Sequence, residues 1–127
     1  MSLAEHRDAL LRSGTAVSLE GLADTTGMDI GAVMRWAEHL SSVGRLVVVQ
    51  HDGTTLIPDV QLDENGGLHW QVSSRTRQLV AWGMGPWAVW DWWQTPNSWI
   101  TDGRSPAHAV RDGDFDAIDR AIDGMMQ

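Results

Sequence analysis

Residues 19–36 read LEGLADTTGMDIGAVMRW, and this segment specifies the fold of the first half of the chain. Ala23 is small at a position where a following helix has to cross the helix that carries it. Gly27 is free to take the left-handed turn conformation that a side chain resists. Val33 and Trp36 then pack the second helix of the segment onto the first. This spacing predicts a helix-turn-helix.

Signals for helix ends surround that segment. We expect a first helix over Leu3–Arg12, with Leu3, Leu10 and Leu11 turned inward and Ser13-Gly14 ending it. Ser18 and Asp29 are candidates for the N-caps of the next two helices, because a short polar side chain there can accept from a free backbone N–H. The third helix is expected to stop at Gly44. Its apolar residues recur at a helical period; they are Ile30, Val33, Met34, Ala37 and Leu40.

A β-hairpin is predicted after the third helix. Leu46–Gln50 is short and β-branched, residues 51–54 (HDGT) are typical of a tight turn, and Thr55–Ile57 returns before Pro58. Three short helices followed by a hairpin predict a winged helix-turn-helix module over residues 1–58.

The remainder, residues 59–127, is helical by pattern and rich in tryptophan. The polar residues 63–67 indicate a turn between the two modules. Ser73 or Ser74 is the expected cap of a helix that reaches Trp82, and Pro86 suits the first turn of the next helix. Two further helices are expected, one beginning at Ser105-Pro106 and one near Asp114. The predicted fold class is therefore mainly α with a small β-hairpin.

Composition narrows the range of functions. The chain has 127 residues, 17 Asp and Glu against nine Arg, no Lys, and a net charge of −8. Cysteine is absent, which excludes disulfides, thiolate metal sites and thiol nucleophiles. No apolar run approaches the ~18–20 residues that cross a bilayer. The N-terminus lacks a signal peptide, so we expect a cytoplasmic protein, and the all-Arg usage favours a bacterial source.

The motifs of catalysis and metal binding are missing. No two of the five histidines are four residues apart, and the calcium-like spacing of Asp112, Asp114 and Asp116 has Ala117 where that loop needs glycine. We find no nucleophile elbow and no glycine-rich phosphate loop. The expectation is a protein that is not an enzyme and that has no metal or cofactor.

Residues that reach DNA would lie on the third helix and just beyond it. Arg35 and His39 are the candidates for contacts with base edges, and Arg45 is a third DNA-binding candidate. Residues 1–58 carry four Arg against seven acidic residues, so this module has little positive charge with which to neutralise DNA phosphates. Two alternatives stay open at this point: a DNA-binding module, in which a dimer gathers Arg35 and Arg45, or a purely structural or dimerising module.

Tryptophan is the unusual feature of the second half. The chain has eight Trp, no Tyr and one Phe, and six of the Trp fall between Trp82 and Trp99. Large flat side chains of this kind are buried in a core or against a partner. Trp87, Trp90 and Trp93 share one helical face and are expected in the core. Trp92 points away from that face, so an exposed or interface position is as open for it as a position in the core.

The order of motifs in this half resembles a known family. Residues 90–100 (WDWWQTPNSWI) are followed by Gly103-Arg104-Ser105-Pro106 and Gly113-Asp114. The pattern is similar to the toxin-binding domain of Xre/MbcA/ParS-type antitoxins, from about Pro58 to Gly124. Two departures are a segment before Ser-Pro that is one residue longer, and Val110 where leucine is common.

The resemblance implies an antitoxin that covers a RES-type toxin, an NAD-consuming enzyme, and that autoregulates its operon through the helix-turn-helix. The acidic balance fits a cover for a cationic nucleotide-binding cleft. On this reading the partner-binding residues are Trp92, Trp99, Arg104, Ile122, Met125 and Met126. Arg104 has the alternative of pairing with a local Asp.

The alternative function is a stand-alone helix-turn-helix transcriptional regulator whose second half dimerises. We expect a homodimer under either function, with operator DNA as an open candidate partner and with no contact with a membrane.

Overall fold

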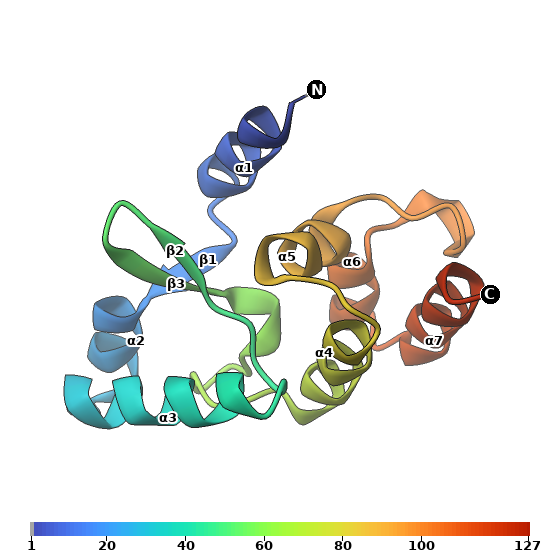
Figure 1. The fold of residues 1–127 in the computed structure, drawn as a ribbon. Helices are drawn as coiled ribbons and strands as arrows, with labels where there is room; N and C mark the ends of the chain where they lie inside the picture. The colour runs from blue at the N-terminus through green and yellow to red at the C-terminus, as the bar shows by residue number, and fades with distance from the viewer. Residues whose placement is uncertain (1) are drawn as a thin grey trace.

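The computed structural model describes residues 2–127, which form seven α-helices and one small three-stranded sheet; the sheet lies with the first three helices, and the last four helices gather beside this group (Figure 1). In chain order the elements are α1 (Leu3–Arg12), β1 (Ala16–Ser18), α2 (Leu19–Thr26), α3 (Ile30–Ser42), β2 (Val49–His51), β3 (Thr54–Pro58), the 3-10 turn η1 (Asp59–Gln61), α4 (Trp70–Ala81), α5 (Pro86–Gln94), the 3-10 turn η2 (Thr101–Gly103), α6 (Pro106–Arg111) and α7 (Phe115–Met125). The prediction of a mainly helical protein with a small β element is confirmed.

Side-chain caps begin the helices where the sequence predicted them. Ser18 accepts from the Gly21 N–H at the start of α2, and Asp29 accepts from the Ala32 N–H at the start of α3. Asp114 caps α7 in the same way. Gly27 ends α2 with a φ of 73°, the left-handed conformation expected of it.

The predicted start of α4 is wrong. The helix begins at Trp70, with His69 as its N-cap, and not at a cap formed by Ser73 or Ser74. Ser73 is buried in the second turn, where its Oγ donates to the backbone carbonyl of Arg45 at 2.8 Å. The side chain is satisfied by a partner 28 residues away, which local sequence reasoning cannot detect.

The three strands are antiparallel in the order β1-β3-β2. The hairpin turn is confirmed at Asp52 and Gly53, whose φ angles of 49° and 77° suit the mirror-image turns that join tight hairpins. Strand β1 was not predicted, because three half-buried residues leave no alternating pattern.

The strand predicted over Leu46–Gln50 is only partly right, because β2 begins at Val49. Leu46 and Val47 are buried without belonging to the sheet. Leu46 packs into the core of the first half and Val47 into the core of the second half. Their apolar character therefore serves two cores and not a strand.

The two predicted modules, residues 1–58 and 59–127, share buried contacts with each other. Leu10 of α1, Val49 of β2 and Trp90 of α5 form one cluster. The indole N–H of Trp90 donates to Oγ1 of Thr15 at 3.0 Å. Leu3, which we expected to face inward, is 67% exposed, because only the C-terminal end of α1 reaches this cluster.

Among residues 2–127, none of the helices combines the length and the apolarity that crossing a membrane requires. Over the same residues, no three His, Asp or Glu side chains gather in an arrangement that could hold a metal ion.

Gln61 links the two halves through its fully buried side chain. Its Oε1 accepts from the Val47 N–H at 2.8 Å, and its Nε2 donates to the carbonyls of Val47 at 3.0 Å and Pro58 at 3.1 Å. The two hydrogen bonds between the Gln61 amide and the Val47 backbone are buried. A buried polar group that loses its hydrogen-bond partner cannot bind water instead, so the loss destabilises the fold.

We predict that Gln61→Leu lowers the free energy of unfolding by about 2–5 kcal/mol, because three buried backbone groups, the N–H of Val47 and the carbonyls of Val47 and Pro58, lose the hydrogen bonds that Gln61 makes with them. Urea denaturation followed by circular dichroism measures the change. Gln78→Leu, at an exposed position of α4, is the control and shifts stability by no more than about 0.5 kcal/mol. Equal stability of the two variants would contradict the structural role of Gln61.

Candidate functional site

Helix α3 presents one face to solvent along the edge of the first half (Figure 1). Val33 and Ala37 turn inward onto α2 and the sheet, and they are almost fully buried. The exposed residues recur three and four positions apart; they are Ile30, Met34, Arg35, Glu38, His39, Ser41 and Ser42. A helix with its inner face packed and its outer face polar can enter a groove of another macromolecule.

Arg35 and His39, both predicted to contact DNA, lie one turn apart on this exposed face. Within residues 2–127, no carboxylate lies within 4.0 Å of the Arg35 guanidinium. The guanidinium lies back over the first turn, where a Cβ on Gly31 would be 3.3 Å from Nη1 of Arg35. The glycine therefore leaves room for the guanidinium beside the helix N-terminus.

The β2–β3 hairpin stands next to α3, and a groove of about 340 Å³ separates them. Met34, Glu38 and Ser41 line it from the helix, and Gln50 and Thr55 line it from the strands. The tip of the hairpin is exposed and polar, and Nε2 of His51 lies 3.2 Å from Oδ2 of Asp52.

Arg45, the third residue predicted to contact DNA, is exposed beyond the C-terminal end of α3. Its backbone N–H donates to the carbonyl of Leu40 at 2.9 Å, so the residue is held against the last turn of the helix. Arg35 and His39 thus share one face, whereas Arg45 extends the exposed surface past the end of that helix.

The partner-binding residues predicted in the second half fall into three environments. Trp92 is half-buried and packs edge-on against Trp93, with the ring centroids 5.0 Å apart. Met125 and Met126 are also partly buried against the core. Ile122 is 1% exposed, so its side chain packs inside the second half and offers no surface for a partner. Trp99 is 58% exposed.

Arg104 is occupied by two ion pairs within the chain. Its Nη1 lies 2.9 Å from Asp112 and its Nη2 lies 2.8 Å from Asp114. This is the local pairing that the sequence left open as an alternative. The hydrogen bond from Arg104 is the main cause that lowers the pKa of the Asp114 carboxyl, and the hydrogen bond to Asp114 is the main cause that raises the pKa of Arg104.

Two exposed tryptophans were not singled out by sequence reasoning. Trp70 is 71% exposed at the start of α4, and Trp82 is 53% exposed at its end. A signal for Trp70 was present, because Ser74 and Arg77, which are four and seven residues later, place it on a polar helical face.

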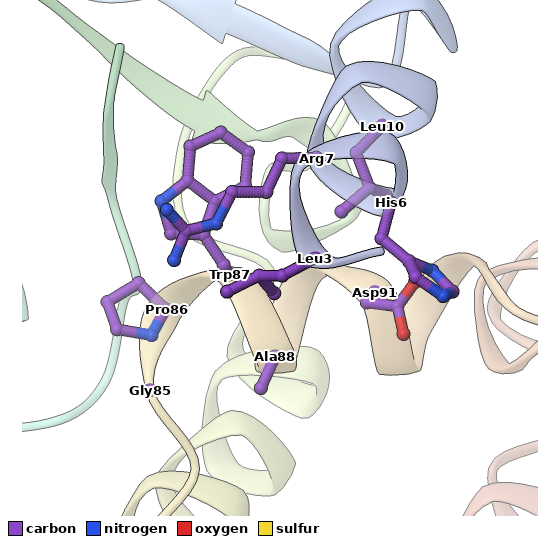
Figure 2. A pocket seen from close by; sticks show the side chains of 9 residues that line it. All are labelled: Leu3, His6, Arg7, Leu10, Gly85, Pro86, Trp87, Ala88 and Asp91. Carbon is purple, nitrogen blue, oxygen red and sulfur yellow. The ribbon is translucent and has the colours of Figure 1, made fainter. Parts of the chain in front are cut away.

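A second groove, of about 390 Å³, runs between α1 and α5 (Figure 2). Its walls are mostly apolar and include Leu3, Leu10, Pro86 and Trp87. The Arg7 guanidinium lies 4.8 Å from the ring centroid of Trp87, a cation–π distance. This contact fastens the exposed part of α1 to α5, so we interpret the groove as the seam between these two helices.

Comparison with known proteins supports the fold alone. No family model matches the chain, and no curated protein matches it. A solved structure that it resembles is the NMR structure of Rv2175c, at 20% sequence identity and a TM-score of 0.59. The match covers 84% of this chain and 80% of that chain.

We predict that Arg104→Gln raises the pKa of Asp114 toward its ordinary value. Because folding lowers this pKa, the carboxylate stabilises the fold above about pH 4, and that contribution is lost as the pH falls through the lowered pKa. The variant therefore loses less stability than the wild type as the pH falls below about 4. An NMR titration of the Asp114 carboxyl measures the shift. Arg12→Gln is the control, and an unchanged Asp114 titration in Arg104→Gln would contradict the pairing.

We predict that Gly124→Ala destabilises the protein only when Trp99 is present. A Cβ on Gly124 would lie 2.5 Å from Cδ2 of the Trp99 indole, so the ring has to leave its seat on α7. In a Trp99→Ala background the same change is expected to stabilise helix α7 by about 0.5–1 kcal/mol, because alanine is the better helix former. Thermal denaturation of the four proteins measures the coupling. Additive effects of the two changes would contradict the contact.

Proposed function

We propose that residues 1–58 form a winged helix-turn-helix module that binds duplex DNA through α3, and that the protein is a DNA-binding transcriptional regulator. The observation that carries this proposal is the exposed, unpacked face of α3 beside the β2–β3 hairpin. In this assignment α3 is the recognition helix and the hairpin is the wing.

The order of the elements supports the assignment. The chain runs α1, β1, α2, α3, β2, β3, and strand β3 lies between the other two strands. Helix α2 packs on α3 through a core that contains Leu22 and Val33. With 13 residues, α3 is about 20 Å long, a length that suits insertion into the major groove.

The chemistry of the exposed face fits the reading of base edges. Arg35 has the planar donor pair that recognises guanine, and Glu38 has acceptors that suit the amino group of cytosine. The acidic net charge of −8 limits non-specific attraction to phosphates. We therefore expect binding that depends strongly on sequence and has a modest dependence on salt.

Selection of duplexes from a random library by the full chain tests the proposal. We expect one enriched sequence motif, and we expect Arg35→Gln to weaken binding to that motif by about tenfold to a hundredfold, the effect of one good base contact. Fluorescence anisotropy with the selected duplex measures both proteins. Arg12→Gln, which makes the same change of charge on α1, is the control.

Two results together would contradict the proposal: a library in which no sequence is enriched, and no measurable binding of any duplex by the full chain at 50 mM salt. Equal binding by wild type and Arg35→Gln would instead contradict the role given to α3.

A second candidate function is the steric masking of a RES-type, NAD-consuming toxin by the second half of the chain. The exposure of Trp99 favours it, because an indole at an interface centre is a common binding anchor. Met125 and Met126, half-buried near the C-terminal end of α7, add an adaptable apolar rim to this surface.

Co-expression with a RES-type toxin tests the masking function. The wild type is expected to co-purify with the toxin and to prevent the loss of cellular NAD, whereas Trp99→Ser loses both effects. Trp82→Ser, at another exposed tryptophan, is the matched control. Cells that lose NAD equally with and without the wild-type chain would contradict this function.

A further inference from the structure

We propose that helix α4 extends the DNA-contacting surface beyond the helix-turn-helix, with Arg77 and Arg45 binding phosphates of the duplex that α3 enters. This inference rests on the proposed DNA-binding function and assigns to it a part of the second half of the chain. The partner is the backbone of duplex DNA, recognised by its charge and not by its sequence.

The segment that follows α3 lies directly against α4. The carbonyl of Arg45 accepts from Oγ of Ser73 at 2.8 Å. One residue earlier, a Cβ on Gly44 would lie 3.5 Å from Cγ1 of Val80. Ser73 and Val80 are seven residues apart, or two helical turns, so the segment runs along one side of α4.

Arg77 occupies the turn of α4 between these two contacts. It follows Ser73 by four residues and precedes Val80 by three, the spacings that place side chains on one helical face. Thr76, on the inward side, is fully buried, whereas Arg77 is exposed. Arg77 therefore lies on the solvent side of the line where the Gly44–Arg45 segment meets the helix.

Both guanidinium groups are available to an anion. Over residues 2–127, neither Arg45 nor Arg77 has a carboxylate within 4.0 Å, whereas Arg75, on the same helix, pairs with Asp119 at 2.9 Å. The proposed phosphate-binding surface therefore consists of two arginines on neighbouring segments, neither of which is neutralised by a carboxylate within 4.0 Å in the described part of the chain.

The position of this surface beyond the end of α3 is the reason for taking the DNA phosphates as its anions. The backbone N–H of Arg45 donates to Leu40 in the last turn of α3, and the Arg45 carbonyl holds Ser73 of α4. Arg45 is thus the residue that joins the recognition helix to α4. A duplex seated on α3 places its backbone beyond the helix ends, which is where proteins commonly contact phosphates.

Salt-dependent binding of the selected duplex by the full chain tests the inference. Each phosphate contact contributes about 0.9 to the slope of log affinity against log salt. We expect Arg77→Gln to reduce that slope by about 1 and Arg45→Gln/Arg77→Gln to reduce it by about 2. The affinity ratio of wild type to Arg77→Gln then falls by about 3.5-fold between 50 and 200 mM salt, and the preferred sequence is unchanged.

Arg120→Gln is the matched control, because Arg120 is exposed on α7, on the other side of α4 from α3 (Figure 1). It should leave the slope as in the wild type. A slope equal to that of the wild type in both Arg77→Gln and the double variant overturns the inference while leaving the DNA-binding function intact. A wild-type chain that binds no duplex overturns both, and thermal denaturation confirms that each variant is folded.

Discussion

The buried amide of Gln61 is the interaction on which the arrangement of the two halves depends. It joins the backbone of Val47, just after α3, to the turn that follows the sheet. A short hydrogen-bonded path continues from there, because Ser73 of α4 holds the carbonyl of Arg45. These bonds fix where the second half begins relative to the end of α3. The candidate DNA surface inherits its geometry from them.

The tryptophans serve two different purposes in this arrangement. Trp90 and Trp93 are buried, and Trp90 reaches across to Thr15 in the first half. Their bulk gives a chain of 127 residues enough apolar surface to hold its two halves together. Trp70, Trp82 and Trp99 are exposed instead, so the second half keeps three large aromatic side chains in contact with solvent.

Sequence reasoning found the elements whose signals are local. The caps Ser18 and Asp29, the left-handed Gly27 and the hairpin turn at residues 52 and 53 all act within a few residues of their own position. It missed what depends on distant partners. Gln61 and Ser73 have ordinary polar side chains in the sequence, and only the fold supplies the backbone groups that bind them.

The candidate site divides in the same way. Arg35 and His39 were found because helical spacing puts them on one outer face. Ile122 and Arg104 were assigned to a partner on the basis of a family resemblance, yet one packs in the core and the other binds Asp112 and Asp114. Arg77 was overlooked, because its place beside Arg45 comes from the packing of α4 on the segment after α3.

The most direct measurement is an NMR titration of the ¹⁵N-labelled full chain with its selected DNA duplex. If the first half reads DNA through α3, amide shifts will concentrate on α3, the β2–β3 hairpin and the middle of α4, and α7 will stay unchanged. Shifts confined to α5–α7, or no shift at all, would show that the exposed face of α3 does not bind DNA.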